Sequence, residues 1–182
     1  MIINKNLAAT KLLWVDLEMT GLDSRKDVIV EVACEVTDFD FTTLASYEAV
    51  IAHPKQVLND MNEWSRVQHQ ASGLTERIKK EGRDERTVVH ELVGFIKAQF
   101  GTEPAVLAGN SIHNDRAFIK AHWPQVEELL HYRMLDVSSL KILMQSKYNI
   151  KFAKKEVHRA FDDIQASIAE LQYYIEALKK LD

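Results

Sequence analysis

The stretch Leu12–Leu22, Leu-Leu-Trp-Val-Asp-Leu-Glu-Met-Thr-Gly-Leu, joins a short apolar run to two acidic residues and a glycine. The apolar run predicts a buried strand. Strand side chains alternate in direction, so Asp16 and Glu18 share one face. Two close carboxylates at intermediate dielectric repel by about 4 kcal/mol, and a divalent cation would offset that repulsion. An edge strand with two solvated acids also fits, and this stretch alone leaves both interpretations open.

The composition is that of an ordinary globular protein. The 182 residues predict one domain over residues 1–182, with 46% hydrophobic and 27% charged residues. The net charge of −4 argues against a long electrostatic track for duplex DNA or RNA. It leaves room for a short nucleic-acid substrate held through metal ions. Cys34, the only cysteine, excludes an intrachain disulfide and is expected in the core.

Targeting signals are not found in the sequence. No charged-then-apolar signal peptide opens the chain, and no run approaches about 18 apolar residues. We therefore expect a cytosolic protein that does not enter a membrane.

Five strands are predicted from the hydrophobic pattern. They are expected at about 11–17, 28–36, 45–51, 105–108 and 132–135. The second and third should form an antiparallel hairpin beside the first. The fold class is therefore α/β, with a mixed five-stranded sheet flanked by helices, and ligands in such sheets favour the strand ends.

The helices are predicted from apolar spacing and from capping residues. They are expected at about 58–70, 88–100, 114–122, 137–147 and 159–181, with Asp136 as the N-cap of the fourth. The charged segment 76–86 is expected to be exposed.

Two later acids can join the pair on the first strand. Asp115 follows the fourth strand in the first turn of a helix, where it could also serve only as a helix-start acid. Asp163 lies one turn into the last helix beside its apolar stripe and should be partly covered, whereas Asp162 points more toward solvent. With Asp16 and Glu18 they make four hard oxygen ligands, which suit two divalent cations, Mg²⁺ or Mn²⁺. The sequence has no Cys/His cluster that suggests zinc.

His158 lies in a basic loop just before the last helix. A lone exposed histidine usually has no function. Beside a metal site, its reference pKa of about 6.5 would make it a suitable general base.

These residues, in this order, resemble the three motifs of the DEDDh 3′→5′ exonucleases, which have a ribonuclease H-like fold. The motif residues are Asp16-Leu-Glu18, Asp115, and His158 five residues before Asp163. Within that superfamily the chain resembles the oligoribonuclease family over nearly its full length. The stretches that carry this resemblance are Trp14–Leu22, Gly109-Asn-Ser111, His131–Ser138 and His158–Ile164.

The resemblance implies a role for each motif residue. Asp16, Glu18, Asp115 and Asp163 would hold two metal ions, and His158 would deprotonate the attacking water.

The resemblance also implies positions that bind the bases and the 3′ nucleotide. Leu22 would wedge between the two bases of a dinucleotide. Trp64 and His69 would line the 3′ nucleotide and its surroundings. From the residues alone, Trp64 could instead be a core anchor and Leu22 an ordinary turn residue.

A cap on the 5′ phosphate is the third implied feature. Ser111, Arg133 and Ser138 match its positions, and arginine forks well onto phosphate oxygens. Tyr132 matches a tyrosine that the second subunit of a homodimer offers. Such a cap would favour the shortest substrates, because a longer strand would collide with it.

The expected function is a metal-dependent 3′→5′ exoribonuclease that hydrolyses very short oligoribonucleotides, dinucleotides above all, to 5′-mononucleotides. One alternative is a DEDDh exonuclease with longer substrates, such as a DNA proofreading subunit or an RNA trimmer. The other is a catalytically silent nucleotide-binding domain, which the complete set of acids and histidine argues against.

Overall fold

One five-stranded sheet organises the computed structural model, which describes residues 9–153 and 160–180. The strands are β1 (Lys11–Met19), β2 (Ile29–Asp38), β3 (Thr43–Val50), β4 (Ala105–Gly109) and β5 (Leu130–Asp136). Their order is β3-β2-β1-β4-β5, with antiparallel β3–β2 and β2–β1 pairs and parallel β1–β4 and β4–β5 pairs. The predicted mixed sheet and hairpin are confirmed. Because β1 is the central strand, the edge-strand interpretation of its acids is wrong.

The alternation of β1 divides the protein into two cores. Leu13, Val15 and Leu17 face a cluster that includes side chains from the α4 and α5 segments. Leu12 and Trp14 face the opposite way, into a cluster with the last helix. The Trp14 indole donates to Thr37 Oγ1 at 2.9 Å, so its polar atom is satisfied where it is buried. Both faces of β1 are therefore fixed by packing.

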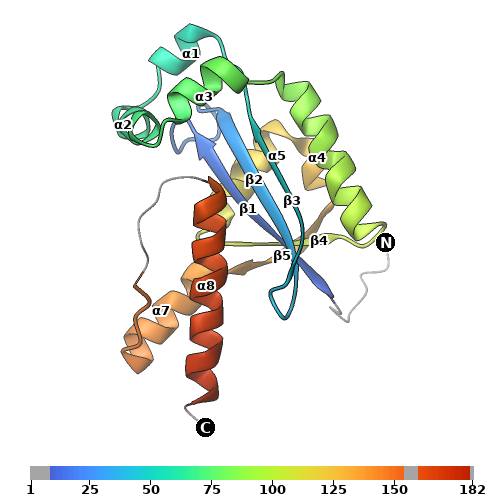
Figure 1. Ribbon diagram of the computed structural model, residues 1–182, viewed down its shortest axis with the longest axis vertical. Coiled ribbons are helices and arrows are strands. Elements are labelled where there is room, and N and C mark those ends of the chain that lie inside the picture. The colour runs from blue at the N-terminus through green and yellow to red at the C-terminus, as the bar shows by residue number, and fades with distance from the viewer. Residues whose placement is uncertain (1–8, 154–159, 181–182) are drawn as a thin grey trace.

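Eight helices are described around this sheet. They are α1 (Lys55–Asn59), α2 (Glu63–Ala71), α3 (Leu74–Glu81), α4 (Glu85–Phe100), α5 (His113–His122), α6 (Pro124–Glu127), α7 (Val137–Tyr148) and α8 (Ala160–Lys179). Figure 1 shows α8 along one face of the sheet, α4 and α5 along the other, and α1–α3 gathered where β1 ends. In the described part of the chain, no helix is long and apolar enough to cross a membrane. That residues 1–182 form one domain stays a prediction.

Several predicted helix boundaries are wrong. The single helix expected at 58–70 is divided into α1 and α2, because Asn62 caps a new helix by accepting from the Ser65 amide at 2.8 Å. The charged segment 76–86 is exposed or partly exposed as expected, except for the buried Ile78 on α3. The short α6, which Pro124 opens, is not among the predicted helices. The Asp136 cap is confirmed, since its side chain accepts from the Ser138 amide at 2.9 Å.

Strand β2 carries two buried acids. Glu31 and Glu35 alternate with apolar residues, and both are covered because helices lie over both faces of the sheet. Arg77 from α3 forms ion pairs with Glu31 and with Glu48 on β3. Glu35 accepts from Thr43 Oγ1 and from Gln165 on α8. Each buried carboxylate thus has donors, as burial of charge requires.

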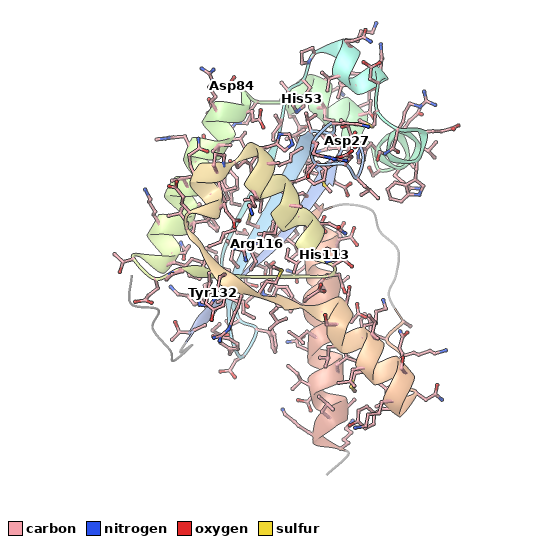
Figure 2. The ribbon with its side chains drawn as sticks, turned by 180° about the vertical axis from the view of Figure 1, so that it is seen from behind. Asp27, His53, Asp84, His113, Arg116 and Tyr132 are labelled. Carbon is pink, nitrogen blue, oxygen red and sulfur yellow. The ribbon has the colours of Figure 1, made fainter. Side chains whose placement is uncertain are left out.

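The loop after β1 is held by Asp27, which Figure 2 labels near the end of the sheet. Its carboxylate accepts from Thr20 Oγ1 at 3.1 Å and from the Asp23 amide at 2.9 Å. Gly21 does not have a positive φ, so backbone conformation is not the reason that glycine occupies this position. A Cβ at Gly21 would meet Asp27 Oδ2 at 2.4 Å, so glycine is needed for close approach.

Replacing Gly21 by alanine should therefore destabilise the protein. The new methyl displaces a carboxylate already engaged in two hydrogen bonds, at a cost of about 1–3 kcal/mol. Thermal unfolding should show a melting temperature lower by about 3–10 °C. Gly94→Ala is the matched control, because Gly94 lies in α4 with nothing within 4 Å of its would-be Cβ. That variant should gain about 0.5–1 kcal/mol. Equal melting temperatures for the two variants would contradict the role given to Asp27.

Candidate active site

Three carboxylates meet where β1 ends and α8 begins. Asp16, Glu18 and Asp163 each offer an oxygen within 4.8 Å of the others. The two β1 acids lie on the strand face that carries Leu12 and Trp14, and this is the face that α8 covers. Figure 1 shows the first turn of α8 close to the end of β1. Asp163 is partly covered and Asp162 is exposed, as the helical pattern predicts.

Asp115 approaches the cluster from the other side of β1. It lies in the first turn of α5, and its Oδ1 accepts from the Leu17 amide at 2.9 Å. Its side chain is only 8% exposed. Asp115 is outside the group of three acids within 4.8 Å, but its hydrogen bond places it at the residue between Asp16 and Glu18. The structure thus brings all four predicted acids to one end of β1.

Burial and mutual repulsion make these acids hard to ionise. The pKa of Glu18 is raised to about 7, mainly by burial and then by the charges of Glu31, Asp163 and Asp115. The pKa of Asp115 is also raised to about 7 by burial, against the opposing effect of the Leu17 amide. Near neutral pH the metal-free site therefore carries protons that a cation would replace.

The donor set fits a hard divalent cation. All four acids supply carboxylate oxygens, the ligands that Mg²⁺ and Mn²⁺ prefer. The pKa of Glu18 is raised mainly by burial and further by three neighbouring acids, so a bound cation would favour its ionised form. Asp16, Glu18 and Asp163 would hold a cation, with Asp115 held nearby by the Leu17 amide.

His69 is buried beneath Glu18. It is 2% exposed, its Nε2 lies 2.9 Å from the Met19 carbonyl oxygen, and its Nδ1 lies 3.6 Å from Glu18 Oε2. Burial lowers its pKa and so favours the neutral imidazole, although the hydrogen bond to Met19 acts in the opposite direction. The contact with Glu18 is not predictable from sequence, because it depends on how α2 folds back over the end of β1. The predicted role of His69 beside the 3′ nucleotide stays a prediction.

Two large apolar side chains are exposed near the same end of the sheet. Leu22, in the loop after β1, is 76% exposed, and Trp64 at the start of α2 is 63% exposed. The interpretation of Trp64 as a core anchor is therefore wrong. Exposed apolar side chains beside an acidic site are suited to stacking on bases.

The predicted phosphate cap gathers at the ends of β4 and β5. The hydroxyls of Ser111 and Ser138 are 3.1 Å apart, and both residues' amides donate to Asp136 Oδ1. Arg133 is exposed, with its guanidinium 4.9 Å from the centre of the Tyr132 ring.

Arg116 supports this edge of the sheet. It follows Asp115 on α5 and donates to the His131 and Tyr132 carbonyl oxygens at 2.9 and 3.2 Å. Figure 2 shows its side chain between α5 and the β5 segment that carries Tyr132. Arg116 also forms an ion pair with Glu127 at 2.9 Å. No sequence pattern singles Arg116 out, since its partners come from later segments of the chain that only the fold brings close.

His158 lies outside the described residues, so its predicted role as general base stays a prediction.

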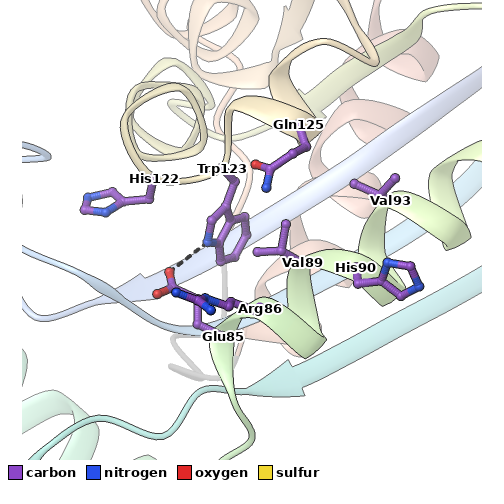
Figure 3. Close-up of a pocket in the computed structure, with 8 residues that line it drawn as sticks. All are labelled: Glu85, Arg86, Val89, His90, Val93, His122, Trp123 and Gln125. Carbon is purple, nitrogen blue, oxygen red and sulfur yellow. Dashed lines mark hydrogen bonds between the residues drawn. The ribbon is translucent and has the colours of Figure 1, made fainter.

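Two surface hollows lie apart from the acids. One of about 440 Å³ is lined from α4, α5 and α6, with the Trp123 indole donating to Glu85 at 2.9 Å (Figure 3). It contains none of the predicted site residues. The other, of about 670 Å³, is lined from β5, α7 and α8, including Leu140, Leu143 and Leu171.

Solved structures resemble this fold. Exonuclease I from Methylocaldum szegediense superposes with a TM-score of 0.66 and 18% identity, covering 88% of this chain and 39% of that one. E. coli exonuclease I in complex with a dA16 oligonucleotide superposes with a TM-score of 0.66 and 13% identity, covering 93% of this chain and 41% of that one. The chain therefore spans about two fifths of these proteins, and the likeness shows the ribonuclease H-like fold.

Sequence comparisons are more specific. The RNase_T family model, described as Exonuclease, matches residues 13–171. The mitochondrial oligoribonuclease of Homo sapiens is 41% identical over 181 residues, covering 96% of this chain and 76% of that protein. The oligoribonuclease of Francisella tularensis subsp. novicida is 41% identical over 173 residues, covering 94% of this chain and 97% of that protein. The chain thus belongs to the oligoribonuclease family of exonucleases.

Proposed function

We propose that this 3′→5′ exoribonuclease acts above all on dinucleotides, which it hydrolyses to 5′-mononucleotides with two divalent cations, Mg²⁺ or Mn²⁺. The observation that carries the proposal is the acid cluster at the end of β1, where three carboxylates lie within 4.8 Å and Asp115 reaches the adjoining amide. The relatives named oligoribonuclease support short RNA as the substrate.

Each acid has a distinct place in the proposed site. Asp16 and Glu18 are held by the central strand, Asp163 by α8, and Asp115 by its bond to the Leu17 amide. When bound, two cations would polarise the phosphodiester and activate water for in-line attack. The side chains' own task is to fix the ligand oxygens on rigid elements before substrate arrives.

His158 is proposed as the general base that takes the proton from the attacking water. The support is its place five residues before Asp163 in the chain and the family to which the chain belongs. A neutral imidazole near pH 7 is suited to that step.

The proposed substrate residues form two groups. The exposed Leu22 and Trp64 would contact the bases, with His69 behind Glu18. Ser111, Arg133 and Ser138 would bind the 5′ phosphate at the ends of β4 and β5. A cap there would stop a longer strand, which favours dinucleotides.

A homodimer is proposed in which Tyr132 reaches the partner's site. Within the described residues β5 forms one edge of the sheet, and Tyr132 on it is 59% exposed. Ile142 and Leu143 on α7 are exposed beside the apolar hollow of about 670 Å³. An open strand edge next to apolar side chains favours a second copy over solvent. The cytosolic location expected from the sequence stays a prediction.

Substrate length tests the proposal most directly. With Mn²⁺, 5′-labelled RNAs of two, five and twenty nucleotides are digested separately, and the rates of loss are compared. The two-nucleotide RNA should disappear fastest, because only it fits between the acids and the cap. Equal rates on the two and the twenty would support the longer-substrate exonuclease instead. No hydrolysis of any of the three would support the silent nucleotide-binding alternative.

The pH dependence of metal binding follows from the raised pKa values. Glu18 and Asp115 hold protons below about pH 7 and must release them to a cation. Two such groups predict an apparent Mn²⁺ affinity roughly 100-fold lower at pH 6 than at pH 8. Calorimetric titration in buffers of different ionisation enthalpy also measures the protons released. Protein stability without metal has the opposite pH dependence. Both groups bind more protons in the folded than in the unfolded state, so their contribution to the free energy of unfolding rises as pH falls from about 7 to about 4.5.

Glu18→Gln provides the control, because it should lower the number of protons released at pH 6. An affinity that is the same at pH 6 and pH 8 would count against Glu18 and Asp115 as ligands.

The proposed base is tested by His158→Ala. Loss of a general base should lower kcat roughly 10²–10⁴-fold while Mn²⁺ binding persists. His90→Ala serves as the matched control, because His90 is exposed on α4 beside the hollow that holds no predicted site residue. It should keep the activity of the unmodified protein. If His158→Ala also keeps full turnover, another group is the base.

A further inference from the structure

Asn110 lies where the cap meets the helix that carries Asp163. It directly follows Gly109, the last residue of β4, which pairs with Asp136 on β5. Its side chain is within hydrogen-bond distance of three groups: Ser138 Oγ at 3.1 Å, Ser167 Oγ at 3.0 Å and Glu170 Oε2 at 3.1 Å. Two of these groups belong to α8 and one to α7, so Asn110 joins three elements.

The orientation of the Asn110 amide follows from its partners. A carboxylate only accepts, so the amide NH₂ must face Glu170. The Ser167 hydroxyl donates its own proton to the Asp163 carbonyl oxygen at 2.8 Å, so it too accepts from Asn110. Both amide protons are therefore committed to α8. The Asn110 oxygen is left to accept from the Ser138 hydroxyl, which is the arrangement observed.

Glu170 is the most firmly held residue of this network. Its side chain is fully buried, and its carboxylate accepts from the Tyr174 hydroxyl at 2.8 Å and from Asn110. Lys141 Nζ lies 3.4 Å from the same carboxylate. The pKa of Tyr174 is raised to about 12, mainly by burial and then by Glu170, so the phenol keeps the proton that it donates. A buried acid with three donors holds its place firmly.

The other end of the network is the pair of cap serines. The Ser111 amide donates to both Ser138 Oγ and Asp136 Oδ1 at 3.0 Å. Ser111 has a φ of 50°, in the left-handed region that non-glycine residues rarely adopt. Such a conformation persists when its surroundings hold it, and strained residues of this kind cluster at binding sites. The hydrogen bonds from Ser111 to Ser138 and Asp136 stabilise this backbone conformation.

One chain of hydrogen bonds thus joins the backbone of Asp163 to the cap. It runs from the Asp163 carbonyl through Ser167, Asn110 and Ser138 to Ser111. Because the chain's members are fixed, the distance between acids and cap is fixed as well.

We propose that Asn110, held by Glu170, is a positioning residue that sets the cap serines at the distance from the acids that a dinucleotide requires. The inference rests on the proposed function, because it takes Ser111 and Ser138 as the site of the 5′ phosphate. Asn110 itself acts through Ser138, and Glu170 acts through Asn110.

The test compares two substrates in the full-length protein with Mn²⁺: a diadenosine monophosphate with a 5′ phosphate and the same dinucleotide with a 5′ hydroxyl. The unmodified protein should prefer the first. In Asn110→Ala the preference, measured as the ratio of kcat/KM values, should fall by roughly tenfold or more, because displaced serines no longer meet the phosphate. The rate on the 5′-hydroxyl substrate should stay within about threefold, since the acids keep their places. Melting temperatures confirm folding.

Two variants of the supporting residues separate positioning from stability. Tyr174→Phe removes one donor to Glu170 Oε1 but leaves Oε2 and Asn110 in contact. It should lower the melting temperature and keep the substrate preference. Glu170→Gln retains an acceptor for Asn110 and should keep most of the preference, whereas Glu170→Met should lose it as Asn110→Ala does. If Asn110→Ala does not fold, the substrate preference of Glu170→Met tests the inference in its place.

The outcomes distinguish this inference from the proposed function. An unchanged preference in folded Asn110→Ala or Glu170→Met overturns the inference and leaves the cap intact. So does an equal loss on both substrates, which would mean general structural support. If the unmodified protein hydrolyses both dinucleotides equally, the cap in the proposed function is wrong, and the inference falls with it.

Discussion

Repulsion among carboxylates at the end of β1 is the constraint on which the active site depends. Charges a few ångströms apart at intermediate dielectric repel by about 4 kcal/mol, and here Asp16, Glu18 and Asp163 lie within 4.8 Å. A flexible segment would relieve that repulsion by moving apart. The central strand cannot, because β2 and β4 pair with it on both sides and its apolar residues pack into two cores. The sheet thus holds a charge arrangement that bound protons or a cation would relieve.

The neighbours of Glu18 limit the repulsion without removing it. Glu31 lies opposite Glu18 across the β1–β2 pair and would add a further negative charge, but Arg77 pairs with it. His69 fills the space behind Glu18, and its lowered pKa favours the neutral form, so it adds bulk and a dipole rather than a positive charge. Neither neighbour therefore supplies a positive charge directly to Glu18, which leaves that role to a bound metal ion.

Features set by local periodicity could be predicted from the sequence, and features set by long-range packing could not. Alternation alone places Asp16 and Glu18 on one face, and the apolar stripe of α8 places Asp163 partly under cover. The antiparallel hairpin follows from two alternating runs. By contrast, the bond from Leu17 to Asp115 and the burial of His69 depend on how distant elements meet. The break between α1 and α2 is not predictable from the apolar pattern, because that pattern continues through the cap at Asn62.

Strand direction explains why the acids and the cap lie together. Strands β1, β4 and β5 run parallel, so their carboxyl ends meet at one edge of the sheet, where ligands bind in α/β proteins. The acids come at the end of β1, Asn110 and Ser111 follow β4, and Ser138 follows β5. The neighbouring strands fix where each group lies, and in our proposal the network through Asn110 sets the spacing between them. Neither group of residues can move without breaking strand pairing or buried hydrogen bonds, so the arrangement suits the short substrate that we propose.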